Sequence, residues 1–171
     1  SSVADLESDQ ADAYFGWAVS SAGDVNGDGY SDVIVGAVAY DFGSGSEGAA
    51  FIFHGSATGL SSTPSIVLQG NETAGDFGYS VGTAGDVDGD GYSDVIVGAP
   101  GASNGGKAYV FRGSPSGIAY PPVVLQVNQN GAGFGTSVAG LGDVDDDGYS
   151  DVVVGAPFYG NSDVGAVFIY H

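Results

Sequence analysis

Apolar residues occur along the chain in short runs, and glycine, serine and polar residues separate these runs. Three runs consist of consecutive β-branched residues, at 33–35, 95–97 and 152–154. Runs of this kind are typical of strands that are buried on both faces. No stretch of about ten residues shows the spacing of apolar side chains that an amphipathic helix requires. The pattern therefore predicts an all-β protein.

These runs belong to three copies of one unit. The stretch 77–99 differs from the stretch 15–37 at five of 23 positions, and 134–156 follows the same pattern. An apolar segment precedes each copy and an aromatic-rich segment follows it, so each unit contains about four strands. Four-stranded units that repeat after 62 and then 57 residues predict the antiparallel blades of a β-propeller. A β-sandwich with an internal duplication is the alternative, but sandwiches rarely repeat so strictly.

The predicted organisation is a single segment over residues 1–171, with one blade per repeat at about 1–56, 57–113 and 114–171. A propeller typically needs about four to eight blades to close, so three blades leave strand edges exposed. Two chains would make a six-blade ring. The segment 3–7 is equivalent to a fourth strand, and we expect it to complete the last blade of a partner chain in a homodimer. The alternative is a fragment of a longer propeller.

An acidic loop lies between the first two strand-like runs of every unit. Loop positions 1, 3, 5 and 9 carry side-chain oxygens, and glycine at position 6 permits a sharp turn around one point. The carbonyl group of position 7 is expected to point inward as well. The candidate ligands are Asp24, Asn26, Asp28, Tyr30 and Asp32 in the first loop, Asp86, Asp88, Asp90, Tyr92 and Asp94 in the second, and Asp143, Asp145, Asp147, Tyr149 and Asp151 in the third.

Such a concentration of carboxylates predicts a bound cation, because the charges would otherwise repel one another. A flexible cage made only of oxygen favours Ca²⁺ over Mg²⁺ and Zn²⁺, so we expect three Ca²⁺ ions per chain. The loops are not EF-hands, because valine occupies loop position 12 in all three. The first loop has Asn26 in place of one aspartate and is expected to bind most weakly, whereas Asp146 adds a charge to the third.

The charge balance agrees with this interpretation. The chain has 21 acidic and two basic residues, for a formal net charge of −19, and eleven of the acidic residues occupy the proposed ligand positions. Two cations cannot form a nucleic-acid-binding face. A hydrophobic fraction of 43% excludes an acidic disordered chain. No apolar run approaches the roughly 20 residues of a membrane-spanning helix, so no membrane insertion is expected.

The repeated motifs resemble those of FG-GAP repeats, which form the propeller blades of integrin α subunits and occur in many bacterial secreted proteins. The Phe-Gly pairs stand at 15–16, 77–78 and 134–135, and Gly-Ala-Pro triplets stand at 98–100 and 155–157. The first copy departs from the pattern, because Val38 replaces the proline. The resemblance covers nearly the whole chain. It implies four-stranded blades with Ca²⁺ between the first and second strands, and binding or adhesion without catalysis.

The function predicted from the sequence is therefore a calcium-binding interaction or adhesion module that is not an enzyme. Millimolar extracellular Ca²⁺ suits weak sites of this kind, so a secreted or cell-surface protein is expected. The partner would be a protein or a glycan. The alternatives are a glycan-binding lectin, or a non-catalytic part of a larger secreted protein or hydrolase.

Two weaker signals are interpreted as structural. The residues 78–82 match the G-x-S-x-G pattern of hydrolases, but an acidic loop follows them instead of the helix that this motif requires. His54, Arg112 and His171 align directly after the third strand-like run of their units. We interpret the two histidines as exposed residues at strand ends and not as a catalytic pair.

Overall fold

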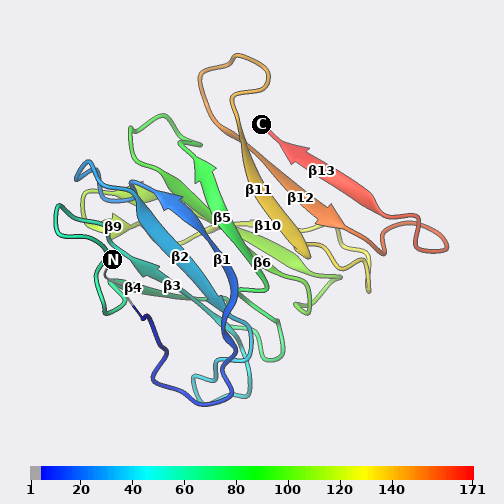
Figure 1. The fold of residues 1–171 in the computed structure, drawn as a ribbon. Coiled ribbons are helices and arrows are strands. Elements are labelled where there is room, and N and C mark those ends of the chain that lie inside the picture. Colours follow the sequence, from blue (N-terminus) through cyan, green and yellow to red (C-terminus); the bar gives the residue numbers. More distant parts are fainter. Residues whose placement is uncertain (1–4) are drawn as a thin grey trace.

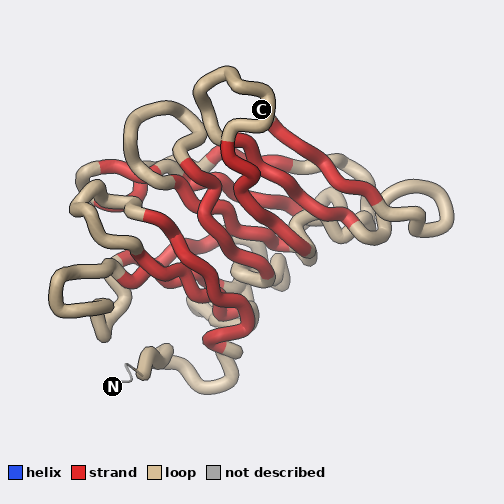
Figure 2. The backbone as a smooth tube through the Cα atoms, turned by 45° about the horizontal axis from the view of Figure 1, so that its top comes forward, coloured by secondary structure: helices blue, strands red, loops and turns tan. Residues whose placement is uncertain are grey.

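The described part of the chain is built from strands and turns. The computed structural model describes residues 5–171, and within this range it contains no helix (Figure 2). The all-β prediction is therefore confirmed. Within the same range, no helix is long and apolar enough to cross a membrane.

The strands form three main sheets and one short hairpin (Figure 1). All neighbouring strands in the sheets are antiparallel. The first sheet contains β1 (Phe15–Gly23), β2 (Asp32–Ala37), β3 (Ala49–Phe53) and β4 (Ile66–Gln69). The second contains β5 (Ser80–Gly85), β6 (Asp94–Ala99), β7 (Lys107–Phe111) and β10 (Val123–Leu125). The third contains β11 (Ser137–Gly142), β12 (Asp151–Ala156) and β13 (Ala166–Tyr170), and the hairpin contains β8 (Gly113–Ser114) and β9 (Gly117–Ile118).

The runs of β-branched residues lie in the second strand of each sheet, which has a neighbour on both sides. In β2, Ile34 belongs to the core between the first and second sheets, and Val35 belongs to a cluster on the other face. In β6, Val95, Ile96 and Val97 are all fully buried. This is the burial expected of a strand that is covered on both faces.

The sheets pack face to face in the manner of propeller blades. Their first strands, β1, β5 and β11, lie side by side (Figure 1). Phe77 packs in the core between the first two sheets, and Phe134 packs in the core between the second and third. Both rings are at most 1% exposed. The phenylalanine of the Phe-Gly pair therefore fills the space between two neighbouring sheets.

The sheets are offset from the repeats that the sequence outlines. The segment 66–69 pairs with β3, and the segment 123–125 pairs with β7, so each fourth strand closes the sheet of the preceding unit. The third sheet has three strands within the described residues. The expected N-terminal strand at 3–7 lies partly outside these residues, and its described part, 5–7, is not paired with a strand of this chain.

Candidate metal centres

The three acidic loops project from the same end of the three sheets (Figure 1). They connect β1 to β2, β5 to β6 and β11 to β12. Backbone hydrogen bonds join the loops in series, because the amide of Ser93 donates to the carbonyl of Asp24 at 2.9 Å and the amide of Ser150 donates to that of Asp86 at 2.8 Å. The face-to-face packing of the sheets thus places the loops in one row.

The aspartate at position 1 organises each loop from within. Asp86 accepts hydrogen bonds from the backbone amides of Gly89, Asp90 and Gly91, at 2.7 to 3.1 Å. Asp24 makes the same three contacts in the first loop. In the third loop Asp143 accepts from Asp147 and Gly148. The loop backbone therefore wraps around one carboxylate, as the glycine at position 6 predicted.

The aspartate at position 9 is buried and joins the loop to the sheet. Asp94 is fully buried, and its two oxygens accept hydrogen bonds from the amides of Val87 and Gly113, both at 2.7 Å. Asp32 makes the equivalent contacts with Val25 and Gly55. The pKa of Asp94 is raised to about 6, because burial, together with the charges of Asp88 and Asp86, outweighs the lowering effect of these two hydrogen bonds.

Carboxylates at positions 1, 3 and 5 converge in two of the loops. Asp86, Asp88 and Asp90 can each offer one oxygen within 4.8 Å of the other two, and Asp143, Asp145 and Asp147 can do the same. The first loop has Asn26 at position 3 and so lacks the third carboxylate. A donor set of oxygen atoms alone, gathered on a flexible loop, fits a hard cation such as Ca²⁺.

The remaining predicted ligands have other neighbours in the structure. Asp94 lies outside the converging group of the second loop. Asp151 forms a second group with His171 and with Asp145, which also belongs to the converging group of the third loop. The rings of Tyr92 and Tyr149 lie against position 4 of the preceding loop, where a Cβ atom on Gly27 or Gly89 would meet them. Coordination by the position-7 carbonyls and by the position-9 aspartates remains a prediction.

The structure places one further residue beside each loop, and one of the two histidines expected to be exposed, His54, is in fact partly buried. Arg112 donates to Asp88 at 3.3 Å, His54 Nδ1 lies 3.4 Å from the Asn26 amide nitrogen, and His171 Nδ1 lies 3.4 Å from Asp145. His171 Nδ1 also lies 3.1 Å from the buried Asp151. All three residues follow the third strand of a sheet and reach position 3 of that sheet's loop. The sequence indicates this shared position, because the three residues align directly after the third strand-like run of each unit.

Antiparallel sheets of three or four strands, packed face to face with one acidic loop at the same end of each, define a segment of the β-propeller class. The model of the FG-GAP repeat family matches residues 15–53, 77–111 and 134–170. The chain belongs to this family, and the resemblance expected from the Phe-Gly and Gly-Ala-Pro motifs is confirmed.

The chain is similar to several integrin α subunits. It is 38% identical to mouse integrin alpha-IIb over 169 residues. The aligned region covers 93% of the chain and 16% of that protein. It is 36% identical over 167 residues to integrin alpha-5 of Xenopus laevis, covering 91% of the chain and 16% of that protein. Integrin alpha-3 of Cricetulus griseus is 38% identical over 159 residues, covering 88% and 15%. The chain therefore spans about one sixth of the length of these relatives.

Proposed function

We propose that this chain is a calcium-binding propeller module of an adhesion or interaction protein, without catalytic activity, that works outside the cell. The observation that carries the proposal is the convergence of three carboxylates at positions 1, 3 and 5 of the second and third loops. Similarity to integrin α subunits supports an adhesive role in the extracellular space. Three Ca²⁺ ions per chain would be bound, one in each loop.

The loop residues would have two roles in holding the ion. The carboxylates at positions 1, 3 and 5 supply negative oxygens, and position 1 also holds the loop backbone through its amide contacts. A bound Ca²⁺ ion would offset the repulsion between these carboxylates. At a free Ca²⁺ concentration of about ten times Kd, each site would stabilise the fold by about 1.4 kcal/mol. Calcium would thus keep the row of loops ordered.

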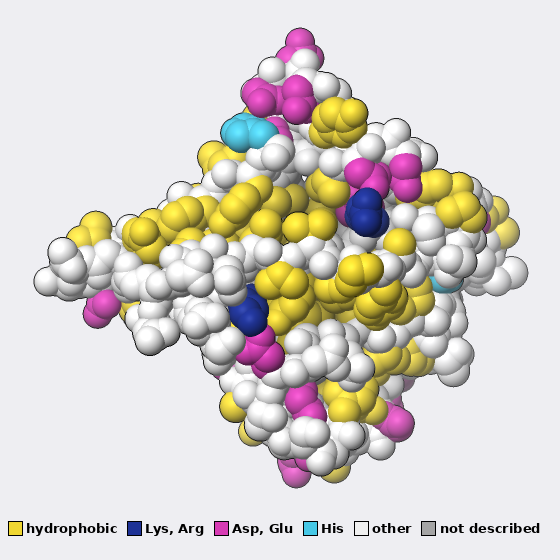
Figure 3. All heavy atoms as spheres, turned by 180° about the vertical axis from the view of Figure 1, so that it is seen from behind, with side chains coloured by type: hydrophobic (Ala, Val, Ile, Leu, Met, Phe, Trp, Pro, Cys, Tyr) yellow, Lys and Arg dark blue, Asp and Glu magenta, His cyan; other side chains and the backbone are white. Residues whose placement is uncertain are grey.

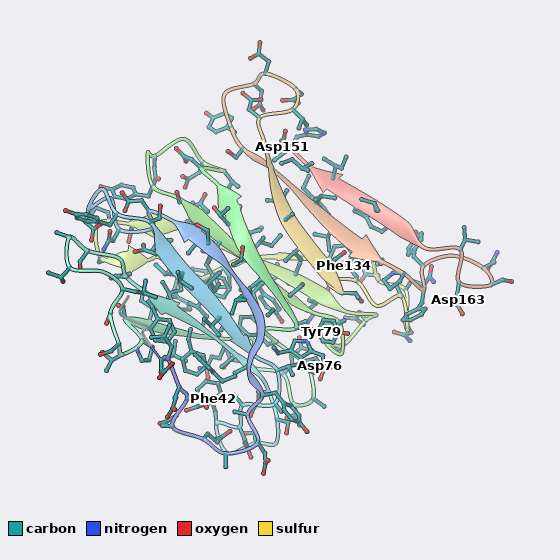
Figure 4. All side chains as sticks on the ribbon, in the orientation of Figure 1. Phe42, Asp76, Tyr79, Phe134, Asp151 and Asp163 are labelled. Carbon is teal, nitrogen blue, oxygen red and sulfur yellow. The ribbon has the colours of Figure 1, made fainter. Side chains whose placement is uncertain are left out.

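Thermal unfolding with Ca²⁺, with Mg²⁺ and with a chelator tests this function. We expect Ca²⁺ to raise the unfolding temperature, and the variants Asp88→Asn and Asp145→Asn to lose part of that gain. Both residues belong to converging groups. Asp163→Asn is the matched control, because Asp163 is exposed and far from the row of acidic loops (Figure 4). An equal gain with Mg²⁺, or no gain with Ca²⁺, would contradict the proposal.

We further propose that a second copy of the chain completes the ring. The third sheet ends in β13, where Val167 and Ile169 are 68% and 52% exposed. A hollow on the same sheet is lined by Val138, Val153 and Val167. An apolar sheet face of this kind suits a neighbouring blade. Light scattering on the chain measures this directly, and a well-folded monomer would refute a homodimer that forms a six-blade ring.

A glycan-binding function is the second candidate, and one cleft favours it. The cleft has a volume of about 340 Å³ and lies among the loops at one end of the second and third sheets. Tyr79, Phe158 and Asp76 contribute two aromatic faces and a carboxylate to its lining. Tyr79 and Asp76 lie at the end of the sheets opposite Asp151 (Figure 4). Binding to a glycan array in Ca²⁺ that disappears in Tyr79→Ala would support this candidate, and retention of binding would exclude the cleft.

A further inference from the structure

In each sheet, one side chain contacts the residue at position 3 of the acidic loop of that sheet. The residue comes directly after β3, β7 or β13, and it contacts Asn26, Asp88 or Asp145. The geometry repeats, since the three distances are 3.3 to 3.4 Å. What differs is the charge. Arg112 carries a permanent positive charge, whereas the imidazoles of His54 and His171 do not.

We infer that Arg112 is an internal counter-cation that weakens Ca²⁺ binding at the second loop. This rests on the proposed calcium function. In the absence of Ca²⁺ the guanidinium offsets the charge of Asp88, so it stabilises the empty loop. With Ca²⁺ bound, the same positive charge stands near a divalent cation and repels it. Both effects act in the same direction, because each one favours the empty loop over the occupied loop.

The environment of this ion pair sets the size of the effect. The side chains of Arg112 and Asp88 are 45% and 31% exposed, so water screens their attraction. Figure 3 shows the two basic side chains of the molecule apart from one another, each beside acidic side chains. The other basic residue is Lys107, which pairs with Glu72 at the start of β7. Exposed pairs of this kind correspond to a change of about two- to five-fold in affinity.

The inference changes the expected order of the three sites. Counting carboxylates alone places the first loop, with Asp24, Asp28 and Asp32, below the second loop, which has four. The guanidinium of Arg112 cancels that difference in formal charge. Within the described residues, no lysine or arginine pairs with the third loop, which also carries the additional carboxylate of Asp146. We therefore expect the third site to be the tightest and the first two to be similar.

A nuclear magnetic resonance titration can follow every loop separately in the intact chain. Each loop contains a glycine at position 6 whose amide donates to the position-1 aspartate, namely Gly29, Gly91 and Gly148. In Arg112→Gln we expect the Ca²⁺ midpoint reported by Gly91 to fall about two- to five-fold, with the other two midpoints unchanged. Arg112→Lys keeps the charge and should keep the wild-type midpoint.

Two further variants make the test decisive. Lys107→Gln removes the other basic charge at the opposite end of β7 and should leave the Gly91 midpoint unchanged. His171→Arg places a guanidinium beside Asp145, where 48% of the present side chain is exposed, and should raise the midpoint of Gly148. An unchanged or higher Gly91 midpoint in Arg112→Gln would overturn the inference. If no glycine signal of the wild-type chain responds to Ca²⁺, the proposed calcium function itself is wrong.

Discussion

Two aspartates of the same loop have different surroundings, although the sequence makes them look equivalent. Asp94 is fully buried, and the amides of Val87 and Gly113 both donate to it. Asp88 is partly exposed, and its contact is with Arg112. Loss of Asp94 leaves two backbone amides without their partner, whereas loss of Asp88 removes one screened ion pair. Asp94 therefore stabilises the fold even without a metal ion.

This difference predicts losses of stability of different size when the two residues are replaced and a chelator is present. Asp94→Ala should lower the free energy of unfolding by about 2 kcal/mol or more, because unsatisfied buried amides cost about 1–3 kcal/mol each. Asp88→Ala should lower it by less than about 1 kcal/mol. Denaturant unfolding with ethylene glycol tetraacetic acid present measures both. Equal losses in the two variants would show that the position-9 aspartate has no separate structural role.

At the scale of the elements, glycine allows the sheets to approach one another closely. A Cβ atom on Gly98 of β6 would collide with the carbonyl oxygen of Gly135, which belongs to the next Phe-Gly pair. Gly36 of β2 stands in the same relation to Gly78. The amide of Gly135 also donates to the carbonyl of Gly155 within its own sheet. The Gly-Ala-Pro motif of one blade and the Phe-Gly motif of the next are therefore two sides of one contact.

Gly98→Ala should consequently separate the second and third sheets. We expect a loss of about 1–3 kcal/mol in the free energy of unfolding, because the collision is with backbone that cannot rotate away. Gly82→Ala in the neighbouring strand β5 is the matched control, since its Cβ atom would meet nothing closer than 3.9 Å. Chemical denaturation compares the two. A control as unstable as Gly98→Ala would mean that strand glycines matter here for another reason than close packing.

At the scale of the whole molecule, the two outer sheets present different faces. On the first sheet Phe51 and Phe53 are at most 3% exposed, because residues such as Leu6, Ala13 and Tyr40 pack over them. On the third sheet Val167 and Ile169 remain more than half exposed. The proposed second copy would therefore bury these exposed apolar side chains of the third sheet.

Val167→Lys combined with Ile169→Lys should abolish the proposed dimer and leave the chain folded. Both side chains are exposed, so the lysines can be solvated in a monomer. Val164→Lys is the control, because Val164 is 81% exposed but precedes β13 and lies outside it. Light scattering reports the mass, and circular dichroism reports the fold. A double variant that remains dimeric would move the interface away from this sheet.

The sequence predicted the features that repeat locally, and it missed those that depend on how distant segments of one blade come together. The short β-branched runs and the acidic loops appear where their spacing placed them. The contact between Arg112 and Asp88 joins residues 24 positions apart, and no local pattern specifies it. The same is true of the partners of the buried Asp94, which are Gly113 at the start of β8 and Val87 in the loop itself. Such contacts can be predicted only when the register of the strands is known.

The hydrogen bonds between successive loops give the molecule a polarity. In each of them the amide comes from the later loop and the carbonyl from the earlier one. Within the described residues, the amide of Ser31 and the carbonyl of Asp143 make no such inter-loop bond. These two groups are complementary, because the amide is a hydrogen-bond donor and the carbonyl is an acceptor. A blade that continues this row beyond the third sheet would therefore donate a loop amide to the carbonyl of Asp143, and this arrangement corresponds to head-to-tail joining of blades.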